Sequence, residues 1–116
     1  MNDSEKILNI KFKIRDNVKY EINKEGIVTV YEKQDHWIQK FLRKLKFKIP
    51  MYKKIIFDKY SSEAFIQIDG IKTVKEIGKY LEDKFGEKVN PLYERLLVFL
   101  NYMCIDCRYI EEINKL

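Results

Sequence analysis

The segment DGIKTVKEIGKYL, residues 69–81, constrains the fold more than any other part of this sequence. Asp69-Gly70 is typical of a tight turn, because glycine readily adopts the backbone angles that turns require. Thr73 stands just before a helical pattern, and Glu76 follows at the spacing of a capping box, in which each residue satisfies a backbone N–H of the other. The segment therefore predicts two short helices joined by a rigid turn.

Two helices are expected from this turn onward, after a first helix at about 60–68 that Asp58 or Ser61 would cap. Apolar residues of the second helix lie at helical spacing, and Gly86 ends it. Gly78 costs roughly 1 kcal/mol relative to alanine inside a helix, so we expect a neighbouring element to approach closely there. The third helix is expected to begin at Asn90-Pro91 with Asn90 as its cap. Its core-facing residues would be Leu92, Leu96, Phe99, Leu100 and Met103.

Alternating apolar residues predict strands before these helices. Residues 18–32 form a hairpin around Gly26, and residues 53–58 form a third short strand. The alternation at 7–14 allows an extra N-terminal strand. The expected fold class is α+β and winged-helix-like: a small three-stranded antiparallel sheet followed by a three-helix bundle, in a single domain over residues 1–116 with a short tail at 105–116.

A basic amphipathic helix is predicted at 36–45, within an insertion at 35–53 between the second and third strands. Three interpretations of this helix remain open: it packs on the domain, it is a docking surface, or it lies on a membrane surface. The formal net charge of +5 favours acidic partners without choosing among them. Because no apolar run of membrane-spanning length and no secretory signal are present, the expected location is the cytoplasm.

The sequence contains few candidate catalytic residues and motifs. His36 is the only histidine, and the nucleotide, hydrolase and metalloprotease motifs are missing. Cys104 and Cys107 in CIDC make half of a zinc site, so a redox or metal role is a minor alternative. We therefore predict a protein that is not an enzyme, with no catalytic residues, no metal and no cofactor.

Binding is the remaining class of function. The third helix has apolar residues beyond those that a small core needs, at Tyr93, Leu97, Val98 and Tyr102. Strand 53–58 is short and apolar, so an extended peptide could add to its edge beside this helix. Plain core packing remains an equal interpretation of these residues. A winged-helix DNA-binding regulator is the alternative function, although Arg95 is the one base-reading cation of the third helix.

The stretch FDKYSSEAFIQIDGIKTVKEI resembles the pyrroloquinoline quinone biosynthesis protein D (PqqD) family. The matching features are an apolar residue and Asp58 at the strand end, the Asp69-Gly70 turn, and Thr-Val-x-Glu-Ile at the start of the second helix. The upstream hairpin and the last helix resemble the family more weakly. Together the resemblance covers roughly residues 18–110.

This resemblance implies a winged-helix-like peptide chaperone. Such a module holds the leader of a ribosomally made precursor peptide as an added strand and presents it to a modifying enzyme, often a radical S-adenosylmethionine maturase. Neither nucleic acid nor membrane is then a partner, while a homodimer stays an open alternative. The insertion 35–53 departs from the family pattern. Carried onto this sequence, the peptide-binding residues are Lys54, Ile55, Ile56, Phe57, Tyr93, Leu97 and Leu100.

Overall fold

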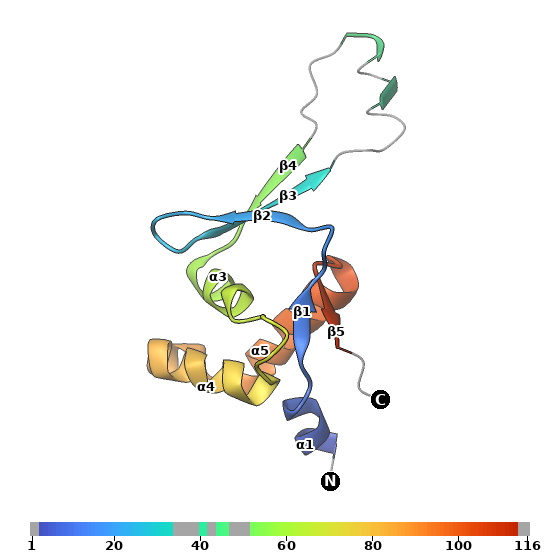
Figure 1. The fold of residues 1–116 in the computed structure, drawn as a ribbon. Helices are drawn as coiled ribbons and strands as arrows, with labels where there is room; N and C mark the ends of the chain where they lie inside the picture. Colours follow the sequence, from blue (N-terminus) through green and yellow to red (C-terminus); the bar gives the residue numbers. More distant parts are fainter. Residues whose placement is uncertain (1–2, 34–39, 42–43, 47–51, 114–116) are drawn as a thin grey trace.

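The computed structural model describes residues 3–33, 40–41, 44–46 and 52–113, and it has the predicted α+β class (Figure 1). Three strands form an antiparallel sheet in the order β2-β3-β4. Their bounds are Lys19–Ile22 for β2, Val28–Lys33 for β3 and Tyr52–Ile56 for β4. The predicted hairpin and third strand are therefore confirmed, with small differences at their ends.

The turn between β2 and β3 is built by Asn23. Its side-chain oxygen accepts the backbone N–H groups of Glu25 at 2.9 Å and Ile27 at 3.0 Å. Gly26 has a φ of 79°, which explains why a glycine stands there. These local contacts fix the register that brings Val28 and Val30 onto the buried face of the sheet.

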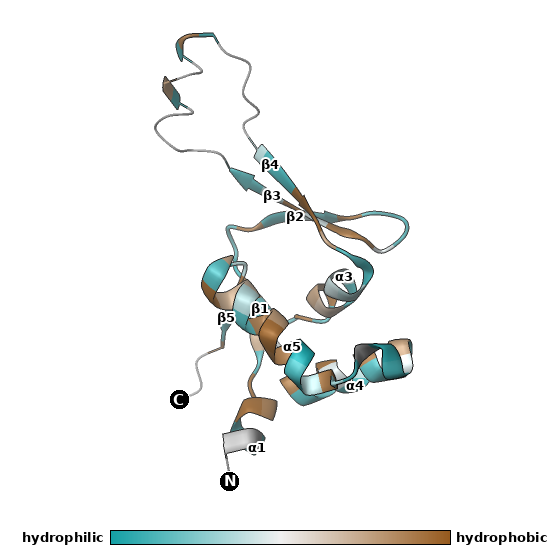
Figure 2. Ribbon diagram, turned by 180° about the vertical axis from the view of Figure 1, so that it is seen from behind, coloured by the Kyte–Doolittle hydropathy of each residue, from teal (hydrophilic) through white to brown (hydrophobic). Residues whose placement is uncertain are grey.

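Three helices pack below this sheet: α3 (Lys59–Ile66), α4 (Val74–Phe85) and α5 (Leu92–Asn101). Figure 2 shows apolar residues along α5, and the core joins the buried face of β3 to all three helices. The predicted core residues of the third helix are all buried. The largest fully buried side chains of the core include Phe65, Ile77, Leu81, Leu96 and Leu100.

The turn before α4 has the predicted construction. Asp69 accepts the backbone N–H groups of Ile71 and Lys72, both at 2.9 Å. Thr73 Oγ1 accepts the N–H of Glu76 at 3.2 Å, and Glu76 Oε1 accepts the N–H of Thr73 at 2.9 Å. The capping box is therefore confirmed. Asp58 likewise caps α3 by accepting the N–H of Ser61 at 2.7 Å.

Both chain ends differ from the prediction. The alternating pattern at 7–14 does not form one strand: Leu8 ends the helix α1 (Asp3–Leu8), and only Phe12–Ile14 forms a strand, β1. The predicted tail is also wrong, because Ile110–Glu112 forms β5, which pairs antiparallel with β1. The physical reason is long-range pairing, which brings together segments that are each too short to signal a strand alone.

The ends of α5 also differ from the expectation. Pro91, not Asn90, occupies the N-cap position, and no side chain caps this helix. At its other end the chain continues as a π-helical segment, Tyr102–Asp106. The N–H of Cys107, the next residue, donates a hydrogen bond to the carbonyl of Tyr102 at 3.0 Å. This wider turn brings the residues after α5 back toward β3.

Most of the predicted helix 36–45, with His36 and Trp37, lies outside the described residues. Lys40, Phe41 and Lys44 are helical. Within the described ranges, every helix is too short or too polar to cross a bilayer.

Candidate functional site

Strand β4 is an edge of the sheet. Its inner neighbour is β3, and within the described part of the chain no further strand pairs with its other side. An edge strand presents backbone donors and acceptors that another extended chain can satisfy. The site is therefore defined first by which amides of β4 point outward.

Hydrogen bonding between β3 and β4 identifies these amides. The N–H of Phe57 donates to the carbonyl of Val28 at 2.9 Å. Backbone groups of an antiparallel strand alternate in direction, so Ile55, which is paired with Val30, also faces β3. The N–H and C=O groups of Lys54 and Ile56 consequently face the outer edge.

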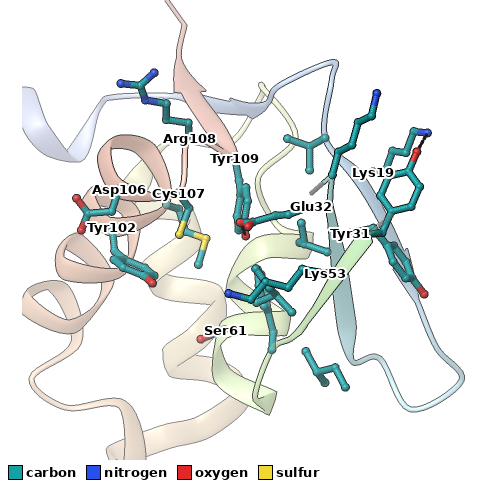
Figure 3. Close-up of a pocket in the computed structure, with 18 of the residues that line it drawn as sticks. Lys19, Tyr31, Glu32, Lys53, Ser61, Tyr102, Asp106, Cys107, Arg108 and Tyr109 are labelled. Atoms are coloured by element: carbon teal, nitrogen blue, oxygen red, sulfur yellow. Dashed lines mark hydrogen bonds between the residues drawn. The ribbon is translucent and has the colours of Figure 1, made fainter. Parts of the chain in front are cut away.

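An open hollow of about 970 Å³ lies between the inner face of the sheet and the segment that follows α5 (Figure 3). On the sheet side, the lining includes Val30 and Glu32 of the inner strand β3, Lys53 and Ile55 of β4, and Phe57 directly after β4. The opposite wall is formed mainly by Tyr102, Met103, Cys107 and Tyr109. An extended chain lying along β4 would place every second side chain in this hollow.

Tyr109 and Glu32 close the inner part of the hollow. The Tyr109 hydroxyl donates a hydrogen bond to Glu32 Oε1, and its ring stacks on Phe57 with 6.3 Å between centroids. Burial, together with the hydrogen bond and charge of Glu32, raises the pKa of Tyr109 far above its ordinary range. The tyrosine therefore stays protonated and links the start of β5 to β3.

Cys107 lines the hollow as a thiol. Burial raises its pKa, the hydrogen bond from Tyr102 acts in the opposite direction, and the charges of Glu32 and Asp106 raise it further. A thiol with a raised pKa is a poor nucleophile near neutral pH. Cys104 and Cys107 are both free, and the described residues contain no group of three or more potential metal ligands of the His, Cys, Asp and Glu types.

The residues expected to bind a peptide separate into two sets. Ile55, Ile56 and Phe57 line the hollow, whereas Lys54 does not. Lys54 leaves the face of the strand opposite to Ile55, and its backbone groups face the outer edge. The three helical residues do not line the hollow. Tyr93 packs against Gly78 of α4, Leu97 is half-buried against the core, and Leu100 is buried.

Sequence reasoning missed most of the helical wall. The sequence pattern predicts Met103 as a core residue, Tyr102 as part of the surplus apolar surface of the third helix, and Tyr109 as part of a tail. Apolar residues also remain on the outer side of this region: Val98, Tyr102 and Ile105 are all more than half exposed, at 71%, 52% and 62%. The only signal that could have located this wall was the concentration of aromatic residues and cysteines at 102–109.

A second, smaller hollow of about 650 Å³ lies near the N-terminal helix, with Ile7 and Ile10 among its lining residues. It is separate from β4.

Comparison of the chain with protein-family models, with curated proteins and with solved structures gave no match.

Proposed function

We propose that this protein binds an extended peptide as an added strand along the outer edge of β4. The observation that carries the proposal is the outward direction of the Lys54 and Ile56 amides beside an open hollow that apolar, aromatic and charged residues line together. Backbone pairing would supply affinity, and the side chains that enter the hollow would supply selectivity.

The guest that we propose is the leader of a ribosomally made precursor peptide. This choice rests on the resemblance to the PqqD family, in which winged-helix-like modules hand such leaders to a modifying enzyme. The order of elements supports it: a hairpin, a third strand and three helices follow one another from β2 to α5. In this proposal the protein itself performs no chemistry, and a separate enzyme, such as a radical S-adenosylmethionine maturase, modifies the presented peptide.

DNA binding is less well supported than peptide binding. The one cation that could read bases from α5, Arg95, is already engaged within the protein. Its Nη1 donates to Lys88 O at 2.6 Å, and its guanidinium lies 4.6 Å from the centroid of the Tyr60 ring. Reading a base would require these contacts to be given up.

Amide hydrogen exchange tests the proposal directly. A random-peptide phage library is selected against the full chain, and the best-enriched peptide is synthesised. Adding it should slow exchange at Lys54 and Ile56 and change little at Ile55 and Phe57, which face β3. Protection elsewhere, with none at β4, would disprove strand addition.

The same preparation distinguishes the other occupants of this edge. Tight binding of duplex DNA with a steep salt dependence would favour the regulator. Slow exchange at Lys54 and Ile56 that depends on protein concentration, without added peptide, would assign the edge to a second copy of the chain.

A further inference from the structure

Lys53 is one of several charged residues that line the hollow, together with Lys19, Glu32, Lys33, Asp58, Asp106 and Arg108, and it is the one that projects from β4 itself. Because Lys53 alternates with Lys54, the two lysines leave opposite faces of β4. Lys53 lines the hollow, and Figure 3 shows its side chain extending from β4 toward the opposite wall. Lys54 does not line it.

No ion pair among the described residues includes Lys53. Its cross-strand partner, Glu32, accepts a hydrogen bond from Tyr109. Asp58 also lines the hollow but caps α3, and Asp106 lies on the far wall. A guest strand would cover Lys53 from the edge and remove water from it, which makes a guest carboxylate there favourable.

Apolar surface lies next to the Lys53 ammonium, two residues further along the same face of β4. Ile55 is the next residue of β4 on the same face, and Tyr102 and Cys107 stand across from it. Residues that lie opposite Lys53 and Ile55 in a guest strand would be in pairs without backbone hydrogen bonds, where antiparallel side chains approach most closely.

We propose that the peptide recognised here carries an aspartate or glutamate two residues from a large apolar residue. The carboxylate pairs with Lys53, and the apolar side chain lies against Ile55 between β4 and the π-helical segment. This spacing holds for either direction of the guest, since inward side chains recur at every second residue. The inference rests on the proposed function, because it specifies the guest of the same edge.

The test uses a random-peptide phage library and the full chain with Lys53→Gln, Lys53→Glu and the matched variants Lys54→Gln and Lys54→Glu. Peptides enriched on the unchanged protein should share the acidic and apolar positions. Lys53→Gln should weaken binding of the best peptide about tenfold, since the bound guest would partly enclose the pair, whereas Lys54→Gln should change its affinity by less than about twofold. Lys53→Glu should select lysine or arginine at the acidic position, and Lys54→Glu should not.

Each other outcome has a definite meaning. Enriched peptides that share apolar residues without an acidic one, or equal losses for the two glutamine variants, would overturn this inference and leave strand addition standing. Failure to enrich any peptide would overturn both proposals. Thermal midpoints of the four variants, measured alongside, show that a loss of binding by Lys53→Gln is not a loss of fold.

Discussion

The ring of Tyr93 in α5 lies directly against the backbone of Gly78 in α4. A Cβ atom added at Gly78 would stand 3.0 Å from Tyr93 Cζ and 3.1 Å from its hydroxyl oxygen, and closer still to Cε1. The predicted close approach at this glycine is therefore confirmed, and it sets the spacing between the two helices.

Replacing Gly78 with alanine should destabilise the protein. The change favours the helix by roughly 1 kcal/mol, but the overlap with Tyr93 should cost more, so we expect a net loss of about 1–2 kcal/mol in the free energy of unfolding. Urea denaturation monitored by circular dichroism measures this.

The control for Gly78→Ala is the same change in a Tyr93→Ala background. With the ring removed, the alanine at 78 should stabilise the helix by about 0.5–1 kcal/mol relative to Tyr93→Ala alone. A stabilising Gly78→Ala in the otherwise unchanged protein would contradict the steric explanation.

Tyr109→Phe should also lower stability, for a different reason. The change keeps the stack on Phe57 and removes the hydrogen bond that the Tyr109 hydroxyl donates to Glu32, so the carboxylate loses this donor at a half-buried site. We expect a loss of about 1–2 kcal/mol. Tyr31→Phe is the matched control, because Tyr31 makes the same bond to Glu21 on the exposed face. Equal losses for the two variants would contradict the role of burial.

Glu63 should make stability depend on pH. Burial alone would raise its pKa, but hydrogen bonds from Lys84 at 3.0 Å, Tyr80 at 3.0 Å and Lys59 at 3.2 Å outweigh it and hold the pKa below the ordinary value of 4.5. A lowered folded-state pKa means that this stabilisation is present above pH 4.5 and is lost as the pH falls through the folded-state value.

Glu63→Gln tests this pH dependence. The variant should be less stable than the unchanged protein by about 1 kcal/mol at pH 7, a figure reduced because both lysines are partly exposed. The difference should shrink as the pH falls below about 4.5 in urea titrations. A difference that stays constant down to pH 3 would exclude the carboxylate charge as its cause.

The features that sequence reasoning predicted depend on neighbours close in the chain. Asp69-Gly70, the Thr73 and Glu76 pair, and the hairpin turn around Gly26 each act within a few residues, so their chemistry identifies their structure. Reliance on such local patterns also explains why the predicted start of α5 differs from the observed one. Asn90 and Pro91 fit the pattern of a cap, but the helix begins one residue later and no side chain caps it.

The hollow could not be predicted because its walls come from distant segments. Tyr109 and Glu32 are 77 residues apart, and β1 and β5 pair across almost the whole chain. Such pairing depends on tertiary packing, which short strands do not encode individually. The strand that borders the expected groove could be predicted from the local alternation of apolar residues. The helical wall could not, because its position depends on the chain turning back after Tyr102.

Ile56→Pro should weaken peptide binding while leaving the fold largely intact. Proline removes the one backbone donor that Ile56 offers to a guest, and proline is tolerated at an edge position whose N–H faces outward. We expect more than a tenfold loss of affinity for the peptide selected from the library, measured by fluorescence anisotropy. Ile56→Ala keeps the N–H and should bind far better than Ile56→Pro, which separates the backbone effect from loss of the side chain.

Ile55→Pro should instead unfold the sheet, because that amide faces β3. If Ile56→Pro binds the peptide as well as Ile56→Ala does, the guest does not pair with this edge.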